Sequence, residues 1–316
     1  MIDSWSSATS GGRGPVDADV KRLLHEHLTG LDPFLAEVAR TFDHLVNPST
    51  RHPDTVVLRI DATWFTELLE VHDVAARDRA ALALAMLAVH TQAQDQRIDR
   101  DLADPSLAWA TDVLSSTLLV EAIAMLCGIA GGDPLFWAQT RAAFTESARG
   151  CLAERTLGTG SDELVGERLV SVVAGRMATL RILVTALACH SRRHERTQPV
   201  QRAIDHLLVA QKLRDDISDW RDDHARGMPT VVLLRLAQRV GRPLHECSPD
   251  DVADALYLFG GLEALVDEID DHLRRAAELI EPYPHRRMGG YVKELRRECA
   301  ALAERVRAHK AGNAAT

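Results

Sequence analysis

Apolar residues recur every three to four positions along most of the chain, which is the spacing of one face of an α-helix. The pattern predicts helices over residues 17–45, 62–71, 74–99, 107–128, 135–157, 162–194, 200–225, 229–240, 249–259, 262–280 and 287–309. Several of these segments are apolar over much of their circumference, as are helices deep in a bundle. The alternation that is typical of strands is nearly absent. We therefore expect an all-α fold, a single large helical bundle.

Breaks in this pattern set the expected boundaries. Two prolines interrupt residues 47–54, and the run Gly131-Gly132-Asp133-Pro134 ends the helix before it. Residues 1–15 are rich in glycine and serine and predict a disordered leader, while residues 311–316 predict a frayed tail. No repeat of fixed period and no linker divides residues 16–310, which we expect to form one helical domain.

The charge balance narrows the class of ligand. The chain has 37 basic and 46 acidic residues and a formal net charge of −9. Such a balance excludes a general nucleic-acid binder, which needs a basic surface for phosphates. An anionic ligand can still bind to an acidic chain when divalent cations lie between the two.

Cysteine usage and hydropathy bear on the compartment. The five cysteines are widely spaced and form no C-x-x-C pair, which is typical of reduced thiols in a cytoplasmic protein. The N-terminus is polar and lacks the apolar core of a signal peptide. The longest apolar stretch, residues 113–130, is interrupted by Ser115, Ser116, Thr117 and Glu121 and predicts a buried helix, not a membrane span.

Candidate chemistry is concentrated on the helix expected at 200–225. Asp215, Asp219 and Asp223 are spaced i, i+4, i+8, so they share one helix face. The apolar stripe of this helix runs onto the same face within about 60°, through Ile204, Leu208, Gln211, Asp215, Asp219 and Asp222. A solvated acidic face is the simpler interpretation. However, carboxylates that point toward an interior require a cation.

A second acidic pair, Asp95 and Asp99, lies on the face of the helix expected at 74–99 that carries its apolar stripe. Bundles build metal sites from carboxylates on facing helices. Oxygen ligands without a histidine or cysteine partner favour Mg²⁺ over zinc, and Mg²⁺ completes its shell with water and substrate phosphates. The two acidic helices together therefore predict a phosphorylated substrate.

One histidine pair has the spacing of a zinc site. His190 and His194 are four residues apart, but no third ligand is apparent in the sequence. The surrounding SRRHER segment is typical of a solvated helix end, and we expect no metal there.

The acidic motifs resemble those of the class I isoprenoid synthases, and most closely the terpene cyclases. The run Asp215-Asp216-Ile217-Ser218-Asp219-Trp220-Arg221-Asp222-Asp223 resembles the cyclase pattern (N/D)-D-(L/I/V)-x-(S/T)-x-x-x-E, with Asp219 and Asp223 in place of Ser/Thr and Glu. It is also similar to the prenyltransferase DDxxD and to the squalene-type R-D-x-x-E-D. Asp95 and Asp99 keep the outer acids of a DDxxD motif, with Gln96 at its second position.

The resemblance implies a cytoplasmic Mg²⁺-dependent enzyme that ionises an allylic prenyl diphosphate substrate, and three Mg²⁺ ions. The metal ligands that it implies, which are also its catalytic residues, are Asp95, Asp99, Asp215, Asp219 and Asp223. The residues that it implies for the diphosphate are Arg168, Arg176, Arg286, Arg287 and Tyr291. It implies neither a nucleic-acid partner nor a membrane span, and it leaves a homodimer open.

The sequence favours a terpene cyclase, which releases a terpene and diphosphate. A chain-elongating prenyltransferase needs a basic cluster for a second diphosphate, and residues 47–60 offer only Arg51 and Arg59. A squalene- or phytoene-type synthase gains support from Val173-Ala174-Gly175 and loses it because the chain has only three tyrosines. A helical interaction protein with acidic faces is the alternative without an activity. Aromatic residues make up 4% of the chain, which is low for a pocket that guides carbocations.

Overall fold

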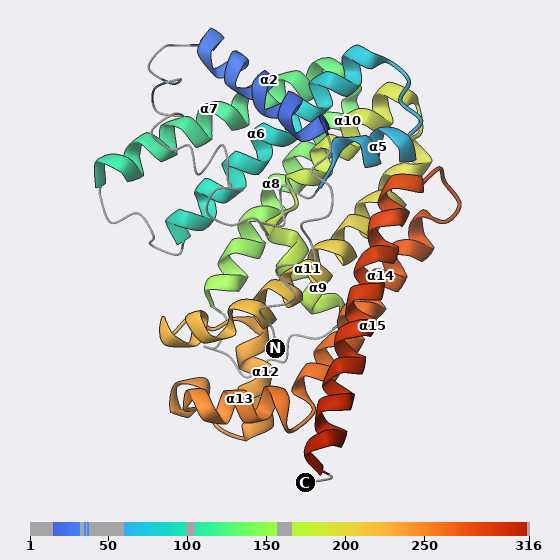
Figure 1. Cartoon of the computed structure of the whole chain (residues 1–316). Coiled ribbons are helices and arrows are strands. Elements are labelled where there is room, and N and C mark those ends of the chain that lie inside the picture. Colours follow the sequence, from blue (N-terminus) through green and yellow to red (C-terminus); the bar gives the residue numbers. More distant parts are fainter. Residues whose placement is uncertain are drawn as a thin grey trace. The chain divides into compact units, whose positions relative to one another are not determined.

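The structure is a computed structural model that describes residues 15–31, 35, 37, 60–98, 105–156 and 166–314 (Figure 1). Every regular element in these ranges is a helix, so the predicted all-α fold is confirmed. The chain divides into two compact units. The first unit comprises Met1–Ala143 and Thr179–Thr197, and the second unit comprises Phe144–Ala178 and Gln198–Thr316.

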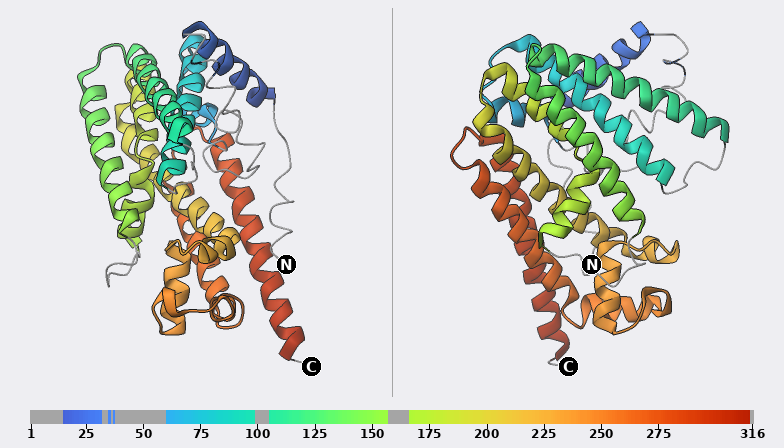
Figure 2. Two further views of the ribbon diagram at one scale, coloured as in Figure 1. Left: turned by 90° about the vertical axis from the view of Figure 1, so that its left-hand side faces the viewer. Right: turned by 180° about the vertical axis from the view of Figure 1, so that it is seen from behind.

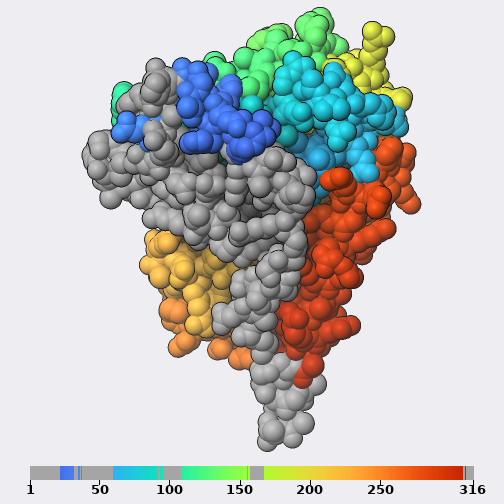
Figure 3. Space-filling view, turned by 45° about the horizontal axis from the view of Figure 1, so that its top comes forward, coloured from blue at the N-terminus to red at the C-terminus, as the bar shows by residue number. Residues whose placement is uncertain are grey.

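The first unit is built around two long helices that lie side by side, α6 and α7 (Figure 2). Its helices are α2 (Pro15–Leu31), α5 (Ala62–Leu68), α6 (Val74–Ile98), α7 (Pro105–Ala130), the first part of α8 (Pro134–Arg155), α10 (Leu180–Ser191) and the 3₁₀-helix η3 (His194–Arg196). Leu87, Leu118 and Leu187 are fully buried where α6, α7 and α10 pack together. Figure 3 shows α2, in blue, on the outside of this unit next to the cyan segment that begins at α5.

The predicted stop after α7 is confirmed. Gly131 and Gly132 have φ values of 64° and 81°, which glycine adopts without strain. Asp133 then opens α8, because its Oδ1 accepts a hydrogen bond of 2.9 Å from the Leu135 backbone N–H.

Helix α7 is the one described helix that is long and apolar enough to cross a bilayer, over Ala108–Ala130. Core helices of proteins without a membrane pass the same test, and Leu114, Leu118 and Leu126 of α7 are fully buried. The expectation of no membrane span and the expected cytoplasmic location remain predictions.

The second unit carries the acidic helix α11. Its helices are the last part of α8, α9 (Gly166–Arg176), α11 (Thr197–Ala225), α12 (Val231–Val240), the 3₁₀-helix η4 (Leu244–Glu246), α13 (Pro249–Tyr257), α14 (Gly261–Ile280) and α15 (Arg286–Ala314). Helices α14 and α15 pack along each other at the C-terminal end of the chain (Figure 1). In the core, the buried imidazoles of His206 on α11 and His272 on α14 share a hydrogen bond of 2.9 Å between their Nδ1 atoms.

Most predicted helices agree with the structure to within a few residues, but the one expected over 162–194 is two helices, α9 and α10. The cause lies at Gly150 of α8 and Gly175 of α9. A Cβ added to Gly150 would lie 2.3 Å from the Arg176 backbone nitrogen, so the two backbones cross almost in contact. Ser147 reinforces the crossing, because its hydroxyl donates to the Arg176 carbonyl at 3.0 Å. The carbonyl at the end of α9 is thus held by α8, and the helix stops there.

Candidate acidic site on helix α11

Helix α11 places two carboxylates, those of Asp205 and Asp216, in the interior of the second unit. Asp216 is 2% exposed, and its Oδ1 lies 2.9 Å from Nζ of Lys212, one turn earlier. This ion pair raises the pKa of Lys212 above its usual value. The other carboxylate oxygen, Oδ2, has no hydrogen-bond partner among the described residues. A buried acceptor of this kind is costly unless something pairs with it.

Asp215 and Asp223 are half-buried next to Asp216. Burial raises the pKa of Asp215 to about 7, and the carboxylates of Asp216 and Asp219 contribute in the same direction. Burial likewise raises the pKa of Asp223 to about 6, with contributions from Asp216 and Asp219. Both carboxyl groups are therefore harder to ionise than in water, chiefly because they are buried, and a bound cation would favour their charged form.

The prediction that Asp219 and Asp222 point toward the interior is wrong, because both residues are exposed. The buried positions of this stretch are Asp216, Ile217 and Trp220. Asp215, Asp219 and Asp223 do share a helix, but they are not drawn into a compact cluster. Within the described part of the chain, a single group of three residues has its metal-binding atoms within 4.8 Å of each other, and it contains no acid of α11. Its members are Asp133, Cys189 and His194.

The stretch upstream of the acids is tied to helix α15. The side-chain N–H of Gln211 donates to the Tyr291 hydroxyl at 2.8 Å. Nη1 of Arg214 lies 3.7 Å from the Glu298 carboxylate, and both side chains are largely buried. Tyr291 thus contacts α11 at Gln211, one helical turn before Asp215. Arg286 and Arg287, at the start of α15, are exposed. Of the three diphosphate residues predicted on α15, the structure thus brings Tyr291 against α11.

The two arginines predicted from helix α9 differ in their surroundings. Nη1 of Arg176 contacts both carboxylate oxygens of Glu154 at 2.7 Å. Glu154 and Arg176 both affect the pKa of Lys212, so this ion pair lies near the acidic stretch of α11. Arg168, at the other end of α9, is exposed and lies in the wall of a cavity.

Arg168 lines a cavity of about 1020 Å³ in the second unit. The cavity lies between the ends of α8, α9 and α11 and the segment from α12 to η4, and its charged or ionisable walls are Arg168, His224, Arg226, Arg235, Arg242 and His245, with Cys247. The charge of Arg226 opposes the rise in the pKa of Asp223, which places this basic wall near the last acid of α11. The sequence did not single out Arg226, Arg235 or Arg242.

The other predicted acids belong to the first unit. Asp95 lies in α6, but its side chain is not among the described ones, and Asp99 lies outside the described residues. His90, one and a half turns before Asp95, has its Nδ1 2.8 Å from the Ser115 hydroxyl of α7. Burial lowers the pKa of His90, so the imidazole is neutral at pH 7.

Sequence reasoning missed the pair of Lys212 and Asp216. The signal was available, because a lysine four residues before an aspartate lies on the same helix face. All five cysteines are free thiols, as expected.

Comparison with known proteins gives the fold and no closer relationship. No protein-family model matches the chain, and no curated protein matches its sequence. Among solved structures, the geranylgeranyl pyrophosphate synthetase from the archaeon Geoglobus acetivorans matches with a TM-score of 0.66 and 14% sequence identity. The match covers 92% of this chain and 97% of that one. The chain therefore has the all-helical fold of the isoprenoid synthases.

Proposed function

We propose that this protein is an isoprenoid synthase that acts on an allylic prenyl diphosphate. The observation that carries the proposal is the acidic stretch of α11, where Asp215, Asp216 and Asp223 are withdrawn from solvent and Asp216 contributes to the raised pKa of the other two. Carboxylates buried on one helix in this way favour a bound cation, and the cation in turn favours a phosphorylated ligand. The fold shared with a prenyl diphosphate synthetase supports the same class of substrate.

We propose Asp95, Asp99, Asp215, Asp219 and Asp223 as ligands of Mg²⁺, with three ions expected. The donor set fits this metal, because it consists of oxygen alone and Mg²⁺ prefers oxygen. Oδ2 of Asp216, which lacks a hydrogen-bond partner among the described residues, adds negative potential beside Asp215 and Asp223. When bound, Mg²⁺ supplies Lewis-acid stabilisation of the departing diphosphate.

The diphosphate itself needs positive side chains. We propose Arg168 and Arg176 of α9 as two of them, since guanidinium matches phosphate oxygens with two parallel hydrogen bonds. Arg176 is already oriented by Glu154, and Arg168 faces a basic cavity. Tyr291, Arg286 and Arg287 of α15 are proposed as the remaining contacts, with Tyr291 held by Gln211.

Prenyl transfer is the reaction we place first. In this reaction, the C–O bond of the allylic diphosphate breaks, a C–C bond forms to a second isoprenoid, and a proton and diphosphate leave. The match to a prenyl diphosphate synthetase favours it over cyclisation. Cyclisation is the second candidate, because the i, i+4, i+8 spacing of Asp215, Asp219 and Asp223 is that of the cyclase motif.

Product analysis tests the proposal and separates the two reactions. The purified chain is incubated with Mg²⁺ and labelled allylic diphosphates of several lengths, with and without isopentenyl diphosphate. A longer prenyl diphosphate that forms only with the second substrate supports elongation, and a symmetric product of two allylic units supports head-to-head coupling.

A hydrocarbon or alcohol formed from the allylic diphosphate alone supports cyclisation. Unchanged allylic diphosphate in every mixture, from protein whose helicity is intact, contradicts an isoprenoid synthase activity altogether.

A further inference from the structure

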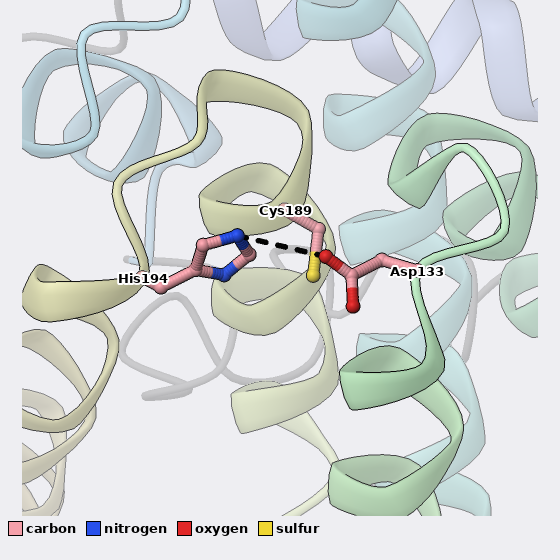
Figure 4. Close-up of side chains that lie close together, drawn as sticks. All are labelled: Asp133, Cys189 and His194. Atoms are coloured by element: carbon pink, nitrogen blue, oxygen red, sulfur yellow. Dashed lines mark ion pairs between the residues drawn. The ribbon is translucent and has the colours of Figure 1, made fainter.

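Three side chains with metal-binding atoms meet in the first unit, and none of them belongs to the acidic helix α11. Asp133 lies in the turn between α7 and α8, Cys189 near the end of α10, and His194 at the start of η3. Figure 4 shows the three side chains pointing toward one another. One oxygen, one sulfur and one nitrogen atom lie within 4.8 Å of each other.

The separation of His194 and Asp133 suits a small ion between them better than a direct hydrogen bond. Nε2 of His194 and Oδ2 of Asp133 are 3.6 Å apart, which is too long for a good hydrogen bond. Metal–ligand bonds of about 2.0–2.3 Å at tetrahedral angles place neighbouring ligand atoms roughly 3.3–3.8 Å apart. The 3.6 Å between Nε2 of His194 and Oδ2 of Asp133 falls within this range.

The fold holds each ligand in place without the help of an ion. Oδ1 of Asp133 is fixed by the Leu135 N–H at the start of α8, which leaves Oδ2 directed at the other two side chains. Arg192 adopts a left-handed conformation with φ 58°, and the Arg193 N–H bonds back to the Ala188 carbonyl at 2.9 Å. This turn reverses the chain after α10, so that His194 returns to Cys189, five residues before it in the sequence.

The ligand types identify the metal. Thiolate, imidazole and carboxylate are the three donors that Zn²⁺ accepts, whereas Mg²⁺ avoids sulfur. Cys189 is 7% exposed, but the His194 side chain is 45% exposed, so one side of the group is open to solvent. An ion there would keep one position for water, as in zinc sites with three protein ligands.

We propose that Asp133, Cys189 and His194 bind a Zn²⁺ ion, with water as the fourth ligand. The expectation that this helix end carries no metal is thereby revised, because Asp133 and Cys189 supply the ligands that the sequence did not reveal. His190, the other member of the predicted histidine pair, is directed elsewhere, with Nδ1 3.3 Å from the Ile129 carbonyl. The ion would join the α7–α8 turn, α10 and η3.

The alternative is that the three side chains only contact one another. Burial and the neighbouring Asp133 carboxylate raise the pKa of the Cys189 thiol to about 11, so without an ion the sulfur keeps its proton. Zn²⁺ would displace that proton and occupy its place beside Asp133. A direct probe of the sulfur–metal bond therefore distinguishes the two arrangements.

Cobalt(II) is the probe, because it takes tetrahedral zinc sites and its bond to thiolate gives a charge-transfer absorption band. The full-length protein, stripped with chelator, should bind one equivalent of Co²⁺ with this band and with the visible bands of tetrahedral Co²⁺. Added Zn²⁺ should remove the bands by displacement. An oxygen-only site on α11 gives no thiolate band, so binding there cannot imitate the result.

Variants assign the ligands. Cys189→Ser should abolish the charge-transfer band, and His194→Gln and Asp133→Asn should each weaken Zn²⁺ binding at least about 10-fold. His190→Gln is the matched control and should bind like the wild type. Melting temperatures measured in chelator show that a variant is folded before its affinity is compared. A wild type without the band, or a band that persists in Cys189→Ser, overturns the proposal.

Discussion

At the residue scale, the buried pair of His206 on α11 and His272 on α14 is a second titratable feature, apart from the acidic stretch of Asp215 to Asp223. A hydrogen bond between two Nδ1 atoms requires that one imidazole donates and the other accepts, so at least one ring must be neutral. Burial is the main cause that lowers the pKa of each histidine to about 4, and the nearby charge of Arg275 contributes. Both rings are therefore neutral in the folded protein at pH 7.

This pair predicts a loss of stability in mild acid. An unfolded histidine takes up its proton near pH 6.5, whereas the folded pair does so near pH 4. Between these values the unfolded chain binds more protons, so the unfolding free energy falls as the pH falls, by about 1.4 kcal/mol per pH unit and proton. Replacing His272 by Asn should make this fall shallower, as measured by urea unfolding at several pH values from 7 to 4.

The exposed His245 provides the control for this experiment. His245→Asn should follow the wild-type curve across the whole range. Equal slopes for His272→Asn and the wild type would contradict the assignment of the acid sensitivity to the buried pair.

The acids of α11 show how far residue patterns predict a site. The sequence shows that several carboxylates lie on one helix, but it does not show which of them is buried. Helical phase pointed to Asp219, whereas the structure buries Asp216, since Lys212 compensates its charge one turn away. Periodicity measures where apolar residues lie, and a buried ion pair is invisible to it.

At the scale of elements, the crossing of α8 and α9 depends on one glycine more than on the other. Gly150→Ala would place a methyl group 2.3 Å from the Arg176 nitrogen and 2.7 Å from the Gly175 carbonyl carbon, which are backbone atoms that cannot rotate away. Overpacking of this kind costs about 1–3 kcal/mol, more than the gain of alanine over glycine in a helix. We therefore expect a lower melting temperature for Gly150→Ala.

Gly175→Ala is the matched comparison. Its Cβ would meet the Glu146 carbonyl oxygen and the Gly150 Cα at 3.6 Å, which is ordinary contact. The better helix propensity of alanine should leave this variant as stable as the wild type or slightly more stable. If both variants melted alike, the close approach would not be what sets the geometry of the crossing.

Helices as whole elements were largely predictable, since each long apolar stripe specifies one. Their interruptions were not. The break between Arg176 and Leu180 follows from contact with α8, and the turn at Arg192 requires a left-handed conformation that arginine seldom adopts. Such features depend on segments far away in the sequence, and they also create the group of Asp133, Cys189 and His194.

At the scale of the whole molecule, the proposed function predicts that metal and diphosphate bind together. A net charge of −9 opposes the binding of diphosphate alone, and the acids of α11 favour a cation. Inorganic diphosphate with Mg²⁺ should raise the melting temperature by several degrees, whereas diphosphate with chelator should not. Asp219→Asn should remove most of this rise and reduce turnover about 100-fold.

Asp267→Asn serves as the control, because it removes one exposed carboxylate of α14 without touching α11. It should retain both the thermal shift and the turnover. A shift that survives in Asp219→Asn, or that needs no Mg²⁺, would argue against metal ligation by this helix.

The division into two units has a consequence for how the protein is made. Residues 144–178 belong to the second unit, yet they are synthesised before residues 179–197, which complete the first. During translation the first unit must wait for α10, while the buried apolar side chains of α9, such as Leu169 and Val170, wait for the rest of the second unit to emerge from the ribosome. Domains generally fold as units and in order of synthesis. Here a part of the second unit is synthesised before the first unit is complete. Helix α9 therefore leaves the ribosome with its apolar side chains exposed, which is the kind of segment that chaperones bind.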